Sequence, residues 1–238
     1  MEKKIKIMAN YLPQYHQIPE NDKWWGAGFT DWVAVKKAQP LFKNHLEPKV
    51  PLNGYYDLSR VEDIRSQIEM ANKYGIYGFA IYHYWFNSNL NLLQKPAEII
   101  LDNKDLDTHF LFLWDNQSWI RTWSKLEKAN DWAPDYDSKE QGENAFSESG
   151  ILAKLDYGNE HDWKTHFDWL LPFFKDDRYV KINNKPVFGF FNACKKEEKE
   201  TQLAMVACWD RLARENGFAG IHCMGRVTHW KNNFSNTL

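Results

Sequence analysis

Residues 74–86 read Tyr-Gly-Ile-Tyr-Gly-Phe-Ala-Ile-Tyr-His-Tyr-Trp-Phe, an apolar run that ends in aromatic side chains and one histidine. A run that is apolar on both faces is typical of a buried strand in a parallel sheet. The preceding residues predict a helix, because Ser59 and Glu62 have the spacing of a capping box and Gly75 stands at the position of a C-terminal cap. The stretch therefore predicts one helix–strand step of a parallel sheet, with a binding surface at the tip of the strand.

The same step recurs near residue 217, where Gly217-Phe-Ala-Gly220 repeats the pattern of Gly75-Ile-Tyr-Gly78. It predicts a helix over 197–216, with Leu203, Val206 and Ala213 on one face, and then a strand over 221–224. The apolar runs 4–10, 110–114 and 186–191 predict three more strands, and 95–101 and 161–174 predict helices. Five strands joined by helices indicate a (β/α) TIM-type barrel or a doubly wound open sheet, and both place their sites at the carboxyl ends of the strands.

Composition limits the classes of function. The chain has 238 residues, which suits a single domain over 1–238, and its 30 Lys+Arg against 32 Asp+Glu give a formal charge of −2. This balance gives no electrostatic reason to expect nucleic acid as a partner. Three cysteines, Cys194, Cys208 and Cys223, are too few for a disulfide framework. With no leader-like segment and no long apolar run, the sequence predicts a cytoplasmic protein without a transmembrane segment.

Aromatic residues are abundant, with 12 Trp, 11 Tyr and 15 Phe, or 16% of the chain. Rings fill protein cores, but Trp and Tyr also offer a flat apolar face and a polar edge, which suit a sugar ring. The long first loop, 18–57, contains Trp24, Trp25 and Trp32 close to Gly26 and Gly28. Glycine lets the backbone pass close to a ligand, so these three tryptophans are predicted to form a wall of the binding pocket, and a hydrophobic cover over the helices is the alternative.

Polar and aromatic side chains collect just past the predicted strands, and parallel strands bring such residues to one face. Tyr15, His16, His83, Tyr84, Asp115 and Gln117 are therefore predicted to line one pocket. The full set of predicted substrate contacts is Tyr11, Gln14, Tyr15, His16, Trp24, Trp25, His83, Tyr84, Trp85, Asp115, Asn116, Gln117, Trp119, Arg121, Asn192 and Arg226.

Asp115 is the carboxylate that the sequence places at this mouth, so it is the candidate catalytic residue. The loops that carry Glu20, Asp22, Asp31, Asp135 and Asp137 are too unconstrained to place those carboxylates there. No glycine-rich nucleotide motif follows any predicted strand, and no cofactor is expected. A metal-dependent hydrolase using His16, His83 and Asp115 is an alternative, although no short-range ligand spacing supports it.

Several motifs resemble one family. They are Tyr11-Leu-Pro-Gln-Tyr-His16, Pro19-Glu-Asn-Asp22, Trp24-Trp-Gly26, Gly28-Phe-Thr-Asp-Trp32, Gly54-Tyr-Tyr-Asp-Leu58, Tyr74-Gly-Ile-Tyr-Gly-Phe79 and Tyr82-His-Tyr-Trp-Phe86. The chain resembles the WbsX family of bacterial polysaccharide-biosynthesis proteins, which are related to the endo-α-1,2-mannosidases of glycoside hydrolase family 99. The resemblance implies a (β/α) barrel that acts on glycans of O-antigen, capsule or lipopolysaccharide, by glycosyl transfer or glycoside hydrolysis.

Two departures from the family pattern bear on activity. The family reads Trp-Ala-Asn-Glu-Asn-Trp where this chain has Trp114-Asp-Asn-Gln-Ser-Trp119, and nothing here matches the family's C-terminal Asn-Glu-Trp-x-Glu-Gly. The resemblance implies that the two Glu of that segment are the acid and base. Five predicted strands against the eight of a closed barrel indicate a C-terminally shortened member with an exposed sheet edge open to association. A non-catalytic glycan-binding remnant is therefore the alternative to an enzyme.

Overall fold

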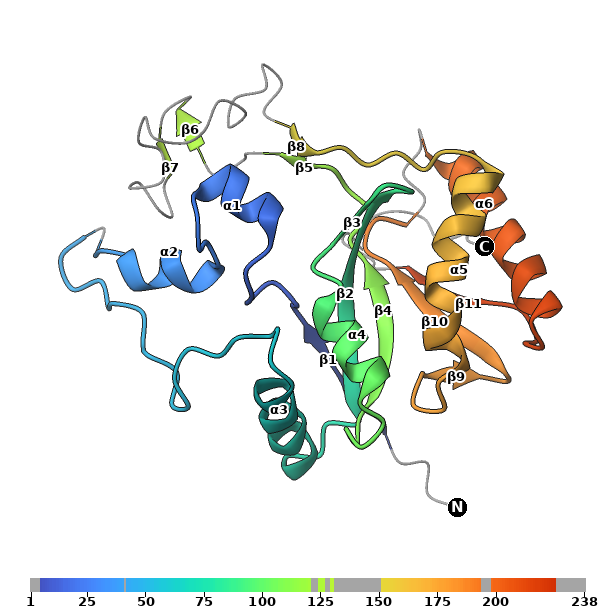
Figure 1. Cartoon of the computed structure of the whole chain (residues 1–238), viewed down its shortest axis with the longest axis horizontal. Coiled ribbons are helices and arrows are strands. Elements are labelled where there is room, and N and C mark those ends of the chain that lie inside the picture. Colours follow the sequence, from blue (N-terminus) through green and yellow to red (C-terminus); the bar gives the residue numbers. More distant parts are fainter. Residues whose placement is uncertain are drawn as a thin grey trace.

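The computed structural model describes residues 5–40, 42–120, 124–126, 129–130, 151–193 and 198–225. In this part of the chain five parallel strands form the main sheet in the order β1-β2-β4-β10-β11 (Figure 1). Their bounds are Met8–Tyr11, Gly78–Asn87, His109–Trp114, Lys185–Phe190 and His222–Gly225. The order has no reversal, whereas a doubly wound sheet has one at its switch point. The topology thus agrees with the predicted barrel, while closure and the number of units stay predictions.

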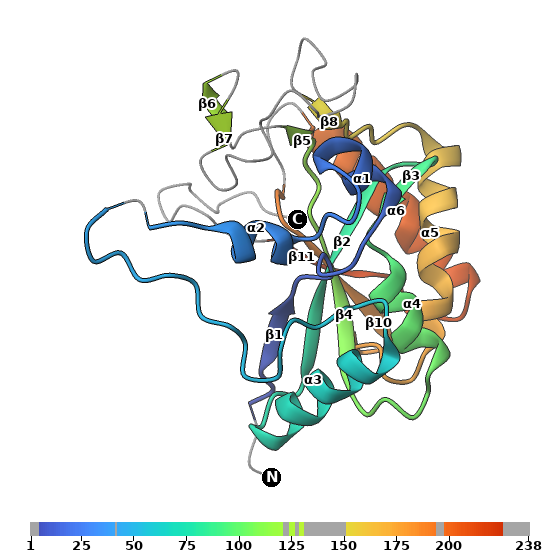
Figure 2. The same ribbon diagram turned by 60° about the vertical axis from the view of Figure 1, so that its left-hand side comes forward.

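Four helices connect these strands, and they all lie on one face of the sheet (Figures 1 and 2). They are α3 (Val61–Lys73), α4 (Lys95–Asp102), α5 (Glu160–Lys175) and α6 (Lys199–Glu215). We call this side the helix face and the opposite side the inner face. Side chains alternate along β2, so Phe79, Ile81, His83 and Trp85 belong to the helix face while Ala80, Tyr82 and Tyr84 belong to the inner face.

Two glycines determine how the chain passes from helix α3 into strand β2. Gly75 has φ +78°, and its N–H donates to the carbonyl of Asn72 at 3.1 Å. A Cβ on Gly78 would lie 2.0 Å from the backbone oxygen of His109 on β4, so no larger residue fits there. The predicted C-terminal glycine cap is confirmed.

The capping box predicted for the same helix is wrong. Helix α3 begins after Arg60, which makes no side-chain cap. The hydroxyl of Ser59 instead donates to Asp57 Oδ1 at 2.7 Å, and Asp63 Oδ2 accepts from the N–H of Asp57 at 2.8 Å. Ser59 is therefore used in the turn that precedes the helix.

The long first loop is not free of secondary structure, contrary to the prediction. It forms two short helices beyond the carboxyl ends of β1 and β2, α1 (Pro19–Trp25) and α2 (Asp31–Lys37). Pro19 suits the first turn of α1 because an N–H there has no partner inside the helix. The other predicted helices and the Asn183-Asn184 turn, where both residues have positive φ, are confirmed.

Of the three residues predicted to share one face of α6, Ala213 is buried in the core and Val206 packs against the core, whereas Leu203 is 38% exposed. Met205, Trp209 and Leu212 supply the rest of the buried face. The remaining strands are short. They are β3 (Leu90–Leu92), β5 (Trp119–Ile120), β6 (Ser124–Leu126), β7 (Ala129–Asn130), β8 (Ile151–Ala153) and β9 (Lys181–Ile182).

Two histidines lie in the core on the helix face. Nε2 of His83 on β2 and Nε2 of His166 on α5 are 2.7 Å apart, and both side chains are buried. His83 stacks on Trp169, and His166 stacks on Trp85 with a centroid distance of 4.2 Å. Burial lowers the pKa of His83 to about 3, and burial and the neighbouring His83 lower that of His166 well below its usual value. One neutral ring therefore donates its Nε2–H to the other.

An ion pair between Arg178 and Asp176 connects two loops at the amino-terminal end of the sheet. Arg178 donates to the backbone carbonyls of Ile100, Asn103 and Leu106 and to the buried carboxylate of Asp176 at 2.8 Å. Burial raises the pKa of Asp176, but hydrogen bonds from Arg178 and Lys104 outweigh it and leave the pKa well below its usual range. The pair thus ties the loop after α4 to the loop after α5.

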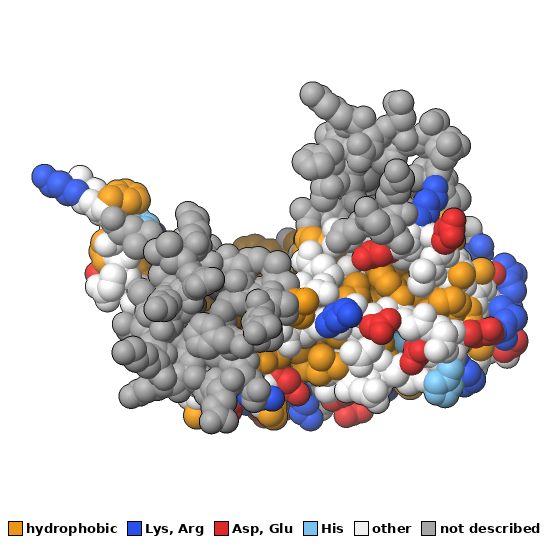
Figure 3. Space-filling view, turned by 90° about the horizontal axis from the view of Figure 1, so that it is seen from above, with side chains coloured by type: hydrophobic (Ala, Val, Ile, Leu, Met, Phe, Trp, Pro, Cys, Tyr) orange, Lys and Arg blue, Asp and Glu red, His pale blue; other side chains and the backbone are white. Residues whose placement is uncertain are grey.

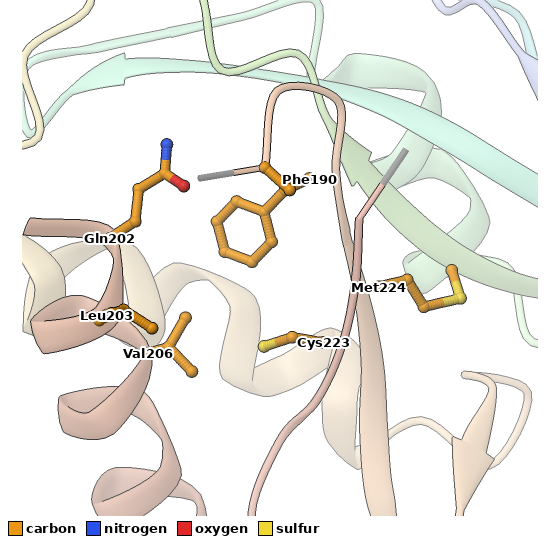
Figure 4. Close-up of a pocket in the computed structure, with 7 residues that line it drawn as sticks. Phe190, Gln202, Leu203, Val206, Cys223 and Met224 are labelled. Atoms are coloured by element: carbon orange, nitrogen blue, oxygen red, sulfur yellow. The ribbon is translucent and has the colours of Figure 1, made fainter. Parts of the chain in front are cut away.

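An apolar recess lies beside each of the two edge strands of the described sheet, β1 and β11. β1 pairs only with β2 and β11 only with β10 among the described residues. An open groove of about 510 Å³ beside β1 and α3 includes Leu12, Met70 and Tyr74. A small pocket between α6 and β11 is lined by Leu203, Val206, Cys223 and Met224, among others (Figure 4). Association through these edges stays a prediction.

We expect Arg178→Ala to destabilise the fold by roughly 3–5 kcal/mol, because three backbone carbonyls lose their donor and the buried carboxylate of Asp176 loses its buried ion-pair partner, keeping the contact with the exposed Lys104. Urea denaturation at pH 7 measures the change, and Arg65→Ala, which breaks the exposed ion pair with Asp105, should leave the midpoint close to wild type. Equal effects of the two substitutions would contradict the structural role of Arg178. Because the pKa of Asp176 is depressed, its contribution is present above about pH 4 and is lost as the pH falls further.

The histidine pair predicts acid sensitivity at a higher pH. Unfolded histidine titrates near pH 6.5, and both native pKa values are lower, so the stability present above about pH 6.5 should decline as the pH falls toward 3. The slope is up to about 1.4 kcal/mol per pH unit for each histidine.

Urea midpoints between pH 7.5 and 5 measure this slope. The double variant His83→Phe with His166→Leu should flatten the curve, whereas His161→Gln, on the exposed side of α5, should keep it. An unchanged slope in the double variant would show that other groups cause the acid sensitivity.

Candidate functional site

Tyr84 is the centre of a polar cluster at the carboxyl end of β2. Its hydroxyl donates to Oε1 of Gln14 at 3.1 Å, and Nε2 of Gln14 lies 3.5 Å from Oδ1 of Asp31. Burial first, and then the charges of Asp115 and Asp31, raise the pKa of Tyr84 well above its usual value, with Tyr82 adding to the effect. We call Gln14, Asp31, Tyr84 and Asp115 the Tyr84 cluster.

The two carboxyl groups of this cluster come from different elements. Asp31 is the first residue of α2 and is half-buried, whereas Asp115 follows β4 and is 8% exposed. The backbone N–H of Asp115 donates to the carbonyl of His83 at 3.0 Å, which fixes its loop to β2. Burial raises the pKa of Asp31 above its usual value, although the hydrogen bond from Gln14 opposes the shift.

Half-buried aromatic rings lie beside Asp31. Tyr15 packs on Trp32 with a centroid distance of 4.4 Å and meets Tyr56 edge-on at 5.3 Å. The indole N–H of Trp32 donates to the carbonyl of Tyr56 at 2.9 Å. Burial, Tyr15 and Asp31 raise the pKa of Tyr56 to about 12. Trp32 is thus partly used in packing, and the rings still present apolar surface next to a carboxyl group.

A second aromatic group packs around Trp119. Its ring meets Tyr84 at 4.9 Å, Phe86 at 5.2 Å and Trp24 at 6.1 Å, all edge-on. Trp24 and Trp25 are buried in the same hydrophobic cluster. For these two tryptophans the structure thus favours the packing interpretation of the first loop, and Trp119 connects their cluster to Tyr84.

Asn116 fastens the ends of β4 and β10 to each other. It is completely buried, its Nδ2 donates to the carbonyl of Asn192 and to the Tyr157 hydroxyl, and its Oδ1 accepts from the Asn192 N–H at 2.8 Å. The Asn192 side chain donates to Oε1 of Gln117 at 3.3 Å. The predicted substrate contact of Asn116 is wrong for a physical reason, since the protein itself occupies its amide.

His16 differs from these residues because its hydrogen-bonding capacity is unused. It lies in the loop after β1 with 2% of its surface exposed, and neither ring nitrogen has a hydrogen-bond partner among the described residues. Burial lowers its pKa. A buried imidazole without a partner is costly, so this position is a candidate contact for a ligand.

Three predicted contacts lie on the helix face, away from Tyr84 and Asp115. His83 and Trp85 pack against α5, and the Tyr11 hydroxyl donates to Gln67 on α3 at 2.7 Å. The prediction that His83 shares a pocket with Asp115 is wrong, because His83 packs against α5 together with its β4 partner Trp114, and Asp115 comes one residue after Trp114 and so faces the opposite side. The metal set of His16, His83 and Asp115 is not assembled for the same reason. Arg121 and Arg226 lie outside the described residues.

The sequence interpretation left out Asp31 as a site residue. Its signal was present in Gly28-Phe-Thr-Asp-Trp32, where Asp31 opens a short helix, but only the fold brings that helix beside Gln14. Tyr157, Glu198 and Gln202 were missed as well. The Tyr157 hydroxyl donates to Glu198 at 3.2 Å and accepts from Gln202 at 2.9 Å, next to Asn116. These residues complete the connection between β4 and β10.

The described surface above the strand ends is mixed in character. Seen from above, the described part of the surface shows hydrophobic side chains next to acidic and basic ones (Figure 3). No group of three metal-ligating side chains occurs within the described ranges. In those same ranges, no helix has the length and apolar character needed to cross a bilayer.

Comparison with known proteins gives the family. The sequence profile described as "Glycosyltransferase WbsX" matches residues 7–237. The uncharacterized protein WxcX of Xanthomonas campestris pv. campestris is 29% identical over 217 residues, which are 91% of this chain and 28% of WxcX.

The fold is similar to that of a solved structure, the glycoside hydrolase family 99 endo-alpha-mannosidase from Bacteroides thetaiotaomicron. The TM-score is 0.50 at 12% identity, over 93% of this chain and 55% of that one. The chain thus spans about a quarter of its curated relative and about half of the chain in this solved structure. Since the profile covers almost all of its residues, the chain belongs to the glycosyltransferase WbsX family.

Proposed function

We propose that this chain acts on glycans, by glycosyl transfer or glycoside hydrolysis, in the biosynthesis or processing of bacterial surface polysaccharide such as O-antigen, capsule or lipopolysaccharide. The observation that carries the proposal is the Tyr84 cluster, which puts two carboxyl groups, an amide and a phenol at the strand ends of a WbsX family member. The names of the family and of the solved structure both refer to carbohydrate chemistry. The proposed architecture is a (β/α) barrel to which the described strands contribute five units in a single domain.

The chemistry of the cluster suits a sugar. Carboxylate and amide oxygens accept hydrogen bonds from hydroxyl groups, and the Gln14 amide can also donate. The neighbouring rings of Tyr15 and Trp32 offer the flat faces that the C–H side of a pyranose packs on. His16 adds a buried imidazole whose nitrogens are unused by described residues.

Within this proposal Asp115 is the catalytic carboxylate and the residues around it contact the substrate. The proposed contacts at these strand ends are Gln14, Tyr15, His16, Tyr84 and Trp119. Gln117 and Asn192 follow β4 and β10, and each amide keeps hydrogen-bonding capacity beyond their mutual contact. Trp24 acts through Trp119, by holding its ring against Tyr84, and Trp25 packs in the same hydrophobic cluster.

A glycan-binding module without turnover is the second candidate, and Gln117 favours it. An amide stands there where the family pattern has a carboxylate, and its Oε1 already accepts from Asn192. An amide can bind a sugar hydroxyl but cannot exchange a proton with it. Binding without cleavage would follow if Asp115 alone carried the chemistry, because cleavage takes two carboxyl groups.

Glycan-array binding and a hydrolysis screen on α-mannosides and surface polysaccharides test the proposal. We expect Tyr84→Phe, which removes the hydroxyl that orients Gln14, to weaken binding of an array hit about 5- to 20-fold, corresponding to a loss of roughly 1–2 kcal/mol. Tyr74→Ala is the control, because Tyr74 is an exposed ring at the opposite end of β2. If no glycan binds and none is cleaved, the proposed function fails.

A further inference from the structure

Residues 42–52, which we call the projecting loop, carry large hydrophobic side chains that face solvent. The loop lies between α2 and α3 and runs along the outside of the molecule, away from the main sheet (Figures 1 and 2). Phe42, Leu46, Val50 and Leu52 are each exposed by 66% or more. Exposed hydrophobic side chains that gather in one place are typical of a surface that binds a partner.

Basic side chains accompany these hydrophobic ones. Lys43 and Lys49 are exposed within the loop, and Lys36 and Lys37 lie in the last turn of α2 just before it. Over residues 36–52 these four lysines stand against one acidic residue, Glu47. The formal charge of −2 for the whole chain is therefore no guide to this segment, which is positive. Figure 3 shows basic and hydrophobic side chains together at the projecting end of the molecule, on its left.

We propose that the projecting loop binds the surface of an anionic lipid bilayer, with its hydrophobic side chains in the interfacial layer and its lysines at the lipid headgroups. Attachment of a protein to a bilayer surface depends on buried apolar area together with attraction to anionic lipids. The loop supplies both within one short segment. The inference goes beyond the proposed function and does not depend on it.

The side chains of the loop favour a lipid surface over a sugar or another protein. Leu46, Val50 and Leu52 are aliphatic, whereas a sugar ring packs on flat aromatic faces. Phe42, the aromatic ring among the four, is already stacked on His45 with a centroid distance of 4.5 Å. Lysine is depleted at protein–protein interfaces, but near an anionic bilayer each lysine strengthens binding.

The backbone of the loop also suits a layer that is poor in water. A backbone N–H that leaves water without a hydrogen-bond partner is costly, and Pro48 and Pro51 have no N–H. The N–H of His45 donates to the carbonyl of Phe42 at 3.0 Å, and the N–H of Gly54 donates to the carbonyl of Pro51 at 2.9 Å. These two turns and two prolines reduce the number of donors that the loop must desolvate.

Sedimentation with lipid vesicles tests the proposal. We expect the protein to bind vesicles made of equal amounts of phosphatidylcholine and phosphatidylglycerol, and to bind them more weakly as salt is added, because salt screens the lysines. Phe42→Ser combined with Leu46→Ser should weaken binding by at least about tenfold, because two side chains no longer enter the apolar layer. Lys43→Gln combined with Lys49→Gln should weaken it by about 30-fold.

Two double variants serve as matched controls. Met70→Ser with Tyr74→Ser replaces two exposed hydrophobic side chains at α3, and Lys175→Gln with Lys199→Gln removes two exposed charges on α5 and α6. Both should bind vesicles like the wild type. Since the substituted side chains of the loop are exposed as well, all four double variants should keep the urea midpoint of the wild type, so that a loss of binding is not caused by unfolding.

Vesicles of phosphatidylcholine alone separate the two contributions. The loop lysine variant should bind them like the wild type, whereas the loop serine variant should bind them more weakly. Absence of binding to the anionic vesicles, or equal losses in the loop and control variants, would overturn the proposal. A dimer in size-exclusion chromatography that the loop variants abolish, without vesicle binding, would also overturn it by showing that the loop is a protein interface. Failure to bind or cleave any glycan would count only against the proposed function.

Discussion

The parallel register of β2 with β4 determines which side chains meet at the strand ends. His83 lies opposite Trp114 in this pairing, so both go to the helix face, and the next residues, Tyr84 and Asp115, go to the inner face together. A shift of one residue would exchange the two sets. Gly78 prevents such a shift, because its Cα lies so close to the His109 carbonyl that no Cβ fits.

The sequence alone predicted the order and type of the main helices and strands, because these depend on local chemistry. Gly75 and Gly217 end helices with positive φ, and Asn183-Asn184 forms the turn into β10. The predicted capping box at Ser59 failed because a serine hydroxyl can hydrogen-bond either to the first turn of a helix or within the preceding turn. Ser59 bonds within its own turn, whereas the capping box occurs on α5, where Asn159 and Asp162 exchange hydrogen bonds.

The candidate site was predictable as a region but not residue by residue. A strand that is apolar on both faces has no alternation of polarity, so nothing in residues 74–86 shows that His83 points to α5 and Tyr84 away from it. The burial of Trp24 and Trp25 could not be predicted either, because the sequence does not distinguish a tryptophan in a pocket wall from a tryptophan in a packed cluster. Asp31 needed the path of the whole first loop, because its partner Gln14 is 17 residues away.

The two ends of the sheet use polar groups in opposite ways. At the amino-terminal end Arg178 and Asp176 satisfy each other and three carbonyls, so their charges serve the fold. At the carboxyl end Asn116 makes the same kind of connection between β4 and β10, and its rigidity holds Asp115, the residue before it, in place. Among the described residues, polar groups that do not connect strands in this way include His16, the carboxyl of Asp31 beside Gln14, and the surface of Tyr15 and Trp32 next to it. We therefore expect the functional site at the carboxyl ends of the strands, because polar side chains there are not all used in hydrogen bonds that connect one strand to another.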